Sequence, residues 1–325
     1  MRSWPLIVCL AATFLVGTCT EGPGSSDERR DGGGAATSGG GGGTTGAVGG
    51  ATAKGGTTGS GGSTSSSPLT KFSFFVISYK AITALAGSTN GFGGDLRYGE
   101  TGPGAGLRGA DKICAAVAER SMAGSSAKQW RAFLSVTADE KGQQVDAIDR
   151  VGEGPWYDRL GRTVALTKAD LLGERPANID TAIQYDLPNE DGVPNHNPDK
   201  TGEVDNHDTI TGSNTQGRLY SATATCKDWT VADGATSNGR PRVGHTWPTG
   251  GQRGCITSSN SAIPPLGDGG PSMNDVSSMC HWISSLDESG CGAGVNLKET
   301  GGPTKDGNIG SGGGYGGFYC FALTP

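Results

Sequence analysis

The chain has 325 residues, a formal net charge of −6 and 59 glycines. An acidic chain lacks the basic face that nucleic-acid binding requires, so we expect no nucleic-acid partner. Charged residues are few, while Gly, Ser, Thr and Asn are abundant. This composition predicts a loop-rich fold in which disulfides compensate for limited regular structure.

Residues 1–19 have the pattern of an export signal. Arg2 supplies a positive start, and an apolar run of eleven residues follows at 6–16. The run is shorter than the about 20 residues that a membrane-spanning helix needs, but it fits the apolar part of a signal peptide. It ends at Thr18-Cys19, which resembles the bacterial lipobox, although Thr is unusual before the cysteine. We expect lipidation at Cys19 and membrane anchoring, and the alternative is simple cleavage and secretion.

The cysteine count agrees with lipidation. Cys9 leaves with the signal, and a lipidated Cys19 would leave six cysteines, all beyond residue 100. Six is an even number, which allows three disulfides in an oxidising compartment but fifteen different connectivities. The six are Cys114, Cys226, Cys255, Cys280, Cys291 and Cys320.

Residues 20–67 are rich in Gly, Ser and Thr. Such a segment has almost no apolar surface to offset its conformational entropy, so we expect a disordered tether. Residues 68–325 are long enough for one large domain with a hydrophobic core. The predicted order is therefore signal, tether and a single folded domain.

The domain mixes helical and strand patterns. Residues 71–79 are aromatic and β-branched, residues 130–135 alternate, and residues 316–323 contain a further apolar run, so each predicts a strand. Residues 106–121 carry apolar side chains at helical spacing. Residues 167–172 predict a short helix with a Thr N-cap. The mixture indicates the α+β class.

Several short motifs follow one another along the domain. They are Gly109-Ala110-Asp111 with Cys114, Trp130–Ser135, Ile148–Arg150, Leu160–Arg162, Ala169–Leu171, Thr211–Ser213, Cys226–Thr230 and Phe318–Phe321. Their order resembles that of the endostatin domain of collagens, which has the C-type-lectin-like fold. The order is also similar to that of bacterial surface-lipoprotein domains of this superfamily, found in spirochaetes and myxobacteria. The resemblance covers about residues 106–230 and 316–323, and residues 231–315 are interpreted as an insertion.

The resemblance implies a disulfide pattern. In this fold a cysteine of the first helix pairs with one of the last strand, which implies Cys114–Cys320. A second bridge of this fold lies within the loop closed by the first, which implies Cys226–Cys291. Cys255–Cys280 would then close the inserted loop.

The acidic polar stretch 187–209 is the best candidate for a binding site. Calcium takes six to eight oxygen ligands, which this stretch supplies densely, and lectin-type domains hold calcium in such a loop. The lectin family's ligand triplets are missing, however, and the spacing does not fit an EF-hand. We therefore favour a solvated loop braced by Asx turns over a calcium site. The candidate calcium ligands are Glu190, Asp191, Asp199, Asp205 and Asp208, and the candidate ligand-binding amides are Asn189, Asn195 and Asn206.

Other chemistry has weak support. Trp156 and Tyr157 follow a Gly-Pro turn and would form a sugar platform, unless they are core aromatics under the turn. The four histidines have no metal-motif spacing, and His245-Thr246-Trp247 is interpreted as a packed loop corner. No hydrolase, zinc-protease or phosphate-loop motif occurs, so we expect a non-enzyme.

The functional expectation is a surface or outer-membrane lipoprotein that binds a glycan or an extracellular protein. Two alternatives remain open: a structural envelope or matrix protein without a discrete ligand, and a hydrolase on an unfamiliar scaffold.

Overall fold

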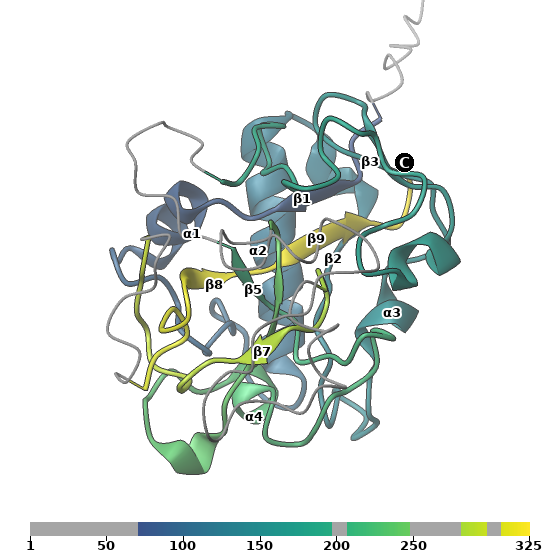
Figure 1. The fold of residues 1–325 in the computed structure, drawn as a ribbon. Helices are drawn as coiled ribbons and strands as arrows, with labels where there is room; N and C mark the ends of the chain where they lie inside the picture. Colours follow the sequence, from purple (N-terminus) through teal and green to yellow (C-terminus); the bar gives the residue numbers. More distant parts are fainter. Residues whose placement is uncertain (1–70, 197–206, 248–280, 298–306) are drawn as a thin grey trace, which may run out of the picture. The chain divides into compact units, whose positions relative to one another are not determined.

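The structure is a computed structural model that describes residues 71–196, 207–247, 281–297 and 307–325. These residues all belong to one compact unit, Thr64–Pro325. The unit combines helices with several small sheets, which confirms the α+β class (Figure 1). Its helices are α1 Tyr79–Ala86, α2 Ala105–Ser121, α3 Ala147–Arg150 and α4 Cys226–Trp229, with 3-10 turns at Ser125–Lys128, Lys168–Leu172 and Thr236–Asn238. Its strands are β1 Phe74–Val76, β2 Trp130–Ala132, β3 Trp156–Tyr157, β4 Thr163–Ala165, β5 Asp208–Ile210, β6 Arg242–His245, β7 Leu286–Asp287, β8 Gly314–Gly317 and β9 Tyr319–Ala322.

A three-stranded antiparallel sheet in the order β1-β9-β2 separates two hydrophobic cores. Successive residues of a strand point to opposite faces, and here both faces are apolar. On β9, Cys320 and Ala322 belong to one core, while Tyr319 and Phe321 belong to the other. The strand is therefore buried on both sides, as its uninterrupted apolar sequence requires.

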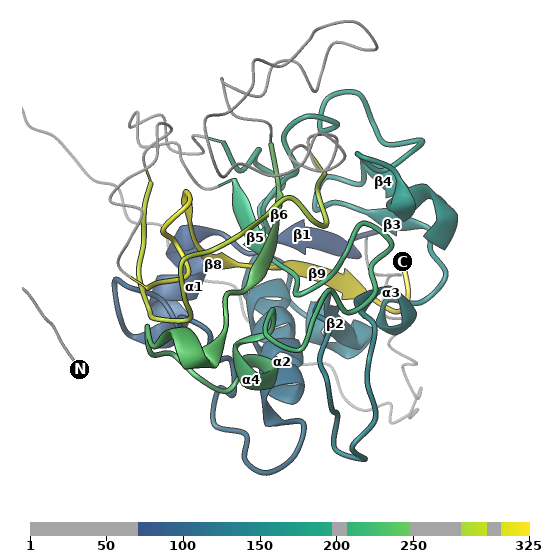
Figure 2. The same cartoon turned by 60° about the horizontal axis from the view of Figure 1, so that its bottom comes forward.

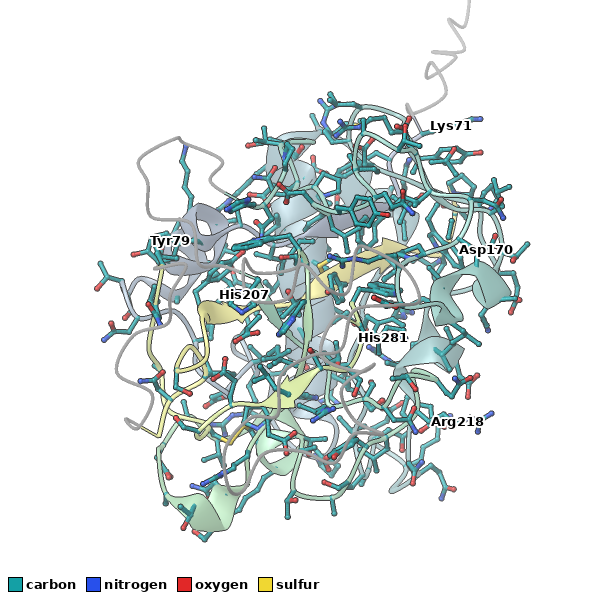
Figure 3. The ribbon with its side chains drawn as sticks, in the orientation of Figure 1. Lys71, Tyr79, Asp170, His207, Arg218 and His281 are labelled. Carbon is teal, nitrogen blue, oxygen red and sulfur yellow. A yellow bond between two sulfur atoms is a disulfide. The ribbon has the colours of Figure 1, made fainter. Side chains whose placement is uncertain are left out.

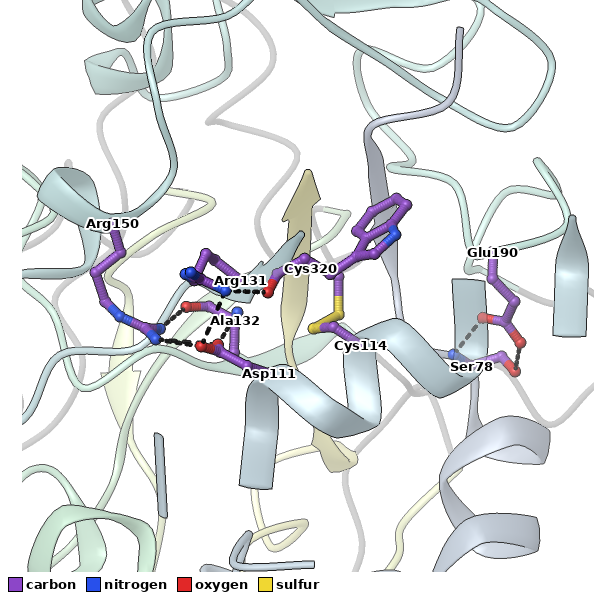
Figure 4. The surroundings of a disulfide bond; sticks show 9 residues. Ser78, Asp111, Cys114, Arg131, Ala132, Arg150, Glu190 and Cys320 are labelled. Atoms are coloured by element: carbon purple, nitrogen blue, oxygen red, sulfur yellow. Dashed lines mark hydrogen bonds and ion pairs between the residues drawn. A yellow bond between two sulfur atoms is a disulfide. The ribbon is translucent and has the colours of Figure 1, made fainter. Parts of the chain in front are cut away.

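Helix α2 covers one face of this sheet (Figure 2). Its buried positions include Ile113, Cys114 and Val117, which confirms the predicted apolar face. Cys114 is bonded to Cys320 of β9, so the helix is fixed covalently to the central strand (Figure 4). A second disulfide joins Cys226 to Cys291. Both implied pairings are confirmed, whereas Cys255–Cys280 lies outside the described residues.

A four-stranded sheet in the order β7-β6-β5-β8 forms the other half of the domain. β8 is followed after one residue by β9, so the two sheets are joined through the C-terminal segment. Strands β6 and β7, and the first residues of β8, come from the stretch 231–315 that was interpreted as an insertion. The described parts of that stretch thus build the sheet itself, and Val243 belongs to the main core.

Several predicted strands and helices begin or end at other residues than the sequence analysis expected. The strand predicted at 71–79 is only β1, because Ser78 accepts a hydrogen bond from the amide of Ala81 and begins α1, which the sequence analysis missed. The strand at 130–135 is limited to β2, and the apolar run at 316–323 divides at Phe318 between β8 and β9. The short helix at 167–172 is confirmed as a 3-10 turn in which Thr167 forms a capping box.

We expect removal of the two disulfides to lower the free energy of unfolding by different amounts. In the chain-entropy description, stabilisation grows with the logarithm of loop length, and the bridged cysteines are 206 residues apart in Cys114–Cys320 and 65 in Cys226–Cys291. Replacing each pair by alanine should lower the free energy of unfolding by about 2–5 kcal/mol, with the longer loop costing about 1 kcal/mol more. Urea unfolding of the two double variants measures this. A larger loss for the Cys226 and Cys291 variant would contradict the prediction.

Candidate functional site

The first part of the polar stretch is a tight, internally bonded loop. Oδ1 of Asn189 accepts hydrogen bonds from the amides of Asp191 and Val193, at 3.0 and 3.1 Å. This is an Asx turn of the kind that the sequence analysis expected. The expected solvated loop is wrong here, because Asn189 and Glu190 are only 5% and 7% exposed. Asn195 is buried and its amide lies 3.3 Å from the hydroxyl of Tyr315. Asn189 therefore braces the loop internally and Asn195 bonds it to Tyr315, and neither side chain is exposed to a ligand.

Glu190 is a structural carboxylate. Its two oxygens accept hydrogen bonds from the amide and the hydroxyl of Ser78, at 2.9 and 2.6 Å (Figure 4). Ser78 is also the N-cap of α1, so Glu190 links the polar loop to the start of that helix. Burial raises the pKa of Glu190, although these hydrogen bonds oppose the shift.

The remaining calcium candidates do not gather around Glu190. Asp191 is exposed at the turn. Asp208 is buried, and it contacts two histidines. Asp199, Asp205 and Asn206 lie outside the described residues. Within the described residues, the proposed calcium set is thus divided among different environments.

The proposed sugar platform at Trp156 and Tyr157 is corrected by the structure. Trp156 is only 1% exposed and packs edge-on against Phe321 in the core. Tyr157 is half-buried, and the ammonium of Lys71 lies over its ring, 4.5 Å from the centre of the ring. Trp156 therefore stabilises the fold, as the alternative interpretation of a core aromatic under a turn stated.

A buried cluster of ionisable side chains lies where β5 and β6 meet. Figure 3 labels His207, the first of its residues in the chain. Oδ1 of Asp208 is 3.3 Å from Nε2 of His207 and 2.9 Å from Nε2 of His245. The three residues are 4%, 2% and 0% exposed in chain order. One nitrogen or oxygen from each lies within 4.8 Å of the others, and this is the one such metal-type grouping in the part of the chain that the structure describes.

The register of the sheet brings the cluster together. Asp208 begins β5 and lies directly opposite His245, the last residue of β6. Directly opposed residues of antiparallel strands place their side chains on the same face, with Cβ atoms about 4.5–5.5 Å apart. His207 precedes β5, and its carbonyl accepts a hydrogen bond from the amide of Thr246. The sequence analysis missed this group because it searched for histidines that are close in sequence.

Glu288 adds a second buried carboxyl beside Asp208. Its Oε2 accepts hydrogen bonds from the hydroxyl of Ser311 and the amide of Gly312, at 2.6 and 2.7 Å. A Cβ at Gly312 would lie 2.5 Å from Oδ2 of Asp208, so only glycine leaves room for both carboxyls. Burial and the charge of Asp208 raise the pKa of Glu288 well above its ordinary value. Burial acts to raise the pKa of Asp208 as well. The neighbouring His207 and His245 have the larger combined effect, so the pKa of Asp208 is lowered.

Ser285 extends the cluster on the far side of His245. Its hydroxyl is 3.2 Å from Nδ1 of His245, whose Nε2 faces Asp208. A serine, a histidine and an aspartate in series also occur in serine hydrolases. Here the hydroxyl-bearing Ser285 is only 5% exposed and His245 is fully buried. We therefore interpret Ser285 as a residue that orients the imidazole.

Aromatic rings border the cluster. Trp247 stacks on His196 with ring centres 3.8 Å apart, and it lies edge-on to His207 at 5.3 Å. Arg175 is half-buried, and its guanidinium donates a 2.6 Å hydrogen bond to the carbonyl of His245. Burial lowers the pKa of Arg175 to about 10, so it stays charged at neutral pH.

A separate polar cavity of about 490 Å³ opens beside α2. At its floor, Asp111 accepts two hydrogen bonds from Arg150, at 2.8 and 3.0 Å, and one from the amide of Ala132 (Figure 4). Arg131 stays about one-third exposed. Burial raises the pKa of Asp111, and the charge of Arg150 acts in the opposite direction. The lining is Leu107, Arg108, Asp111, Arg131, Asp139, Glu140, Val145 and Arg150.

No family of known proteins matches this chain, and a comparison with curated proteins finds no similar sequence. The functional argument therefore depends on the chain's own residues.

Glu190 gives the sharpest test of the polar loop. Glu190→Ala should lower the free energy of unfolding by about 1–3 kcal/mol, because the buried amide of Ser78 loses its acceptor. Asp191→Ala is the matched control at the exposed neighbour, and it should change stability by no more than about 0.5 kcal/mol. Urea unfolding with and without millimolar calcium measures both. Equal stability of the two variants, or a calcium-dependent gain lost in Glu190→Ala, would contradict the structural role.

Proposed function

We propose that the protein is an exported, lipid-anchored binding module with a C-type-lectin-like domain, and that its ligand is a glycan or an extracellular protein. The sequence supports export through residues 1–19 and attachment through Cys19. The two disulfides fit an oxidising compartment outside the cytoplasm. Among the described helices, none has the length and apolar character needed to cross a bilayer. A lipid at Cys19 would supply the attachment.

The polar cavity beside α2 is the observation that carries the binding proposal. Its lining is dominated by charged side chains of both signs. Such a surface suits a polar ligand with hydroxyl, carboxylate or amide groups better than an apolar one. The paired side chains of Asp111 and Arg150 give it a rigid floor, which limits the entropy that ligand binding costs. We therefore propose this cavity, and not Trp156 and Tyr157, as the ligand site.

Anchoring is tested by Cys19→Ser. The variant should move from the membrane fraction to the soluble or secreted fraction, because the acylated thiol is lost. Cys9→Ser is the matched control within the signal and should fractionate like the wild type. A Cys19→Ser protein that stays with the membrane would exclude lipid attachment at this residue.

Ligand binding is tested on arrays of glycans and extracellular matrix proteins. For any ligand found, Arg131→Ala should weaken binding by about tenfold, because one charge-assisted hydrogen bond contributes about 1.5 kcal/mol or more. Arg97→Ala is the control, since Arg97 is exposed, pairs with Asp95 and does not line the cavity. Unchanged affinity in Arg131→Ala would exclude the cavity. An array without any ligand would favour the structural-protein alternative.

A further inference from the structure

We propose that His207, Asp208 and His245 bind a divalent transition-metal ion, for which zinc is the best match. The inference goes beyond the binding function above and does not depend on it. Two imidazoles and one carboxylate are a common ligand set of zinc in proteins, with a fourth position open to water or another ligand. All three side chains are buried, and each presents a ligand atom to the same point between β5 and β6.

The spacing of the ligand atoms fits a tetrahedral ion. With bonds of about 2.0–2.1 Å to nitrogen and oxygen, the ligand atoms of a tetrahedral zinc site lie about 3.3 Å apart. Oδ1 of Asp208 is already 3.3 Å from His207 Nε2 and 2.9 Å from His245 Nε2. The ligand atoms of the two histidines are no more than 4.8 Å apart. All three ligand atoms are therefore close enough together to reach one ion.

The carboxyl oxygens of the cluster also leave room for a cation. No backbone amide or hydroxyl among the described residues donates a hydrogen bond to either oxygen of Asp208 or to Oε1 of Glu288. A buried carboxylate is costly unless charge or hydrogen bonds compensate it. Asp208 is 2% exposed, and its neighbours are the two imidazoles and the carboxyl of Glu288. An ion held by His207, Asp208 and His245 would compensate the buried carboxylate further.

Neighbouring residues hold the ligand side chains in position. A zinc-binding histidine usually donates its other ring N–H to an oxygen, which fixes its tautomer and orientation. The hydroxyl of Ser285 lies 3.2 Å from Nδ1 of His245 and leaves Nε2 directed at Asp208. Glu288 lies beside Asp208 and is held by Ser311 and Gly312. The site is thus built from β5, β6 and the segment after β7.

The ligand chemistry separates this site from the calcium site predicted for the polar loop. Calcium prefers six to eight oxygens, whereas imidazole nitrogen selects zinc and similar metals. Asp208 was counted among the calcium candidates, but its nearest partners are nitrogens. We therefore expect binding of zinc and cobalt, and no binding of calcium or magnesium at this position.

The experiment titrates zinc into the untagged full chain after removal of bound metal with a chelator. Calorimetry should show one zinc ion bound with high affinity, and the melting temperature should rise with zinc concentration because the ion binds only the folded state. X-ray absorption of the complex should show nitrogen and oxygen ligands at about 2.0 Å. Cobalt should give the visible absorption of a tetrahedral site. These measurements on the wild type need no variant.

Variants identify the ligands. Loss of an outer hydrogen-bond partner usually weakens metal binding by about 10–100-fold, and Ser285→Ala should have an effect in this range. His207→Gln and Asp208→Asn each remove a ligand, so each should weaken zinc binding by more than this. His281→Gln is the matched control, because His281 is a buried histidine that bonds the amide of Ile283 and lies outside the cluster. A double Cys255→Ser, Cys280→Ser variant should bind like the wild type, which excludes a thiolate site. Circular dichroism confirms that each variant is folded.

Three results would overturn the proposal. The first is a wild-type protein that binds no zinc in the titration. The second is sulfur ligands at about 2.3 Å in the absorption spectrum. The third is zinc binding by folded His207→Gln and Asp208→Asn variants as tight as that of the wild type.

Discussion

The bond between Cys114 and Cys320 joins the longest described helix to the central strand of the sheet that divides the core. β9 pairs with β1 on one side and β2 on the other, and it presents apolar side chains to both cores. The position of α2, of the aromatic core around Phe321 and, through β8, of the second sheet all depend on this strand. In a chain with 59 glycines and many loops, few other elements could impose that order.

The parts of the fold that the sequence predicted are those with local causes. Helix α2 follows from its apolar period, and the 3-10 turn after Thr167 follows from its cap. The two disulfides followed from the family resemblance and could not be derived from spacing alone. Helix α1 was missed because an apolar strand pattern runs directly into it. Ser78 before it and Gly87 after it were nevertheless readable cap signals.

The site was much less predictable, because it depends on pairing between distant segments. The polar stretch indicated Asx turns without locating them, and its density of carboxylates did not reveal that Glu190 and Asp208 have separate roles. The proximity of His245 to Asp208 is set by the register of β5 on β6, which short strands of mixed composition do not specify. The closeness of Glu288 to Asp208 further depends on the absence of a side chain at Gly312.

The chemistry of an exported domain favours the kind of metal site proposed here. In an oxidising compartment cysteines are consumed by disulfides, as Cys114, Cys226, Cys291 and Cys320 are, so thiolates are poor candidates for metal ligation. Histidine and carboxylate then remain as the ligands that hold zinc. An apolar group of similar volume would often be at least as stable as a buried charged group, so metal binding would give these three side chains a role beyond stability. With an ion bound, the same three residues would cross-link β5 to β6 in the four-stranded sheet, to which the Cys114–Cys320 bond does not belong.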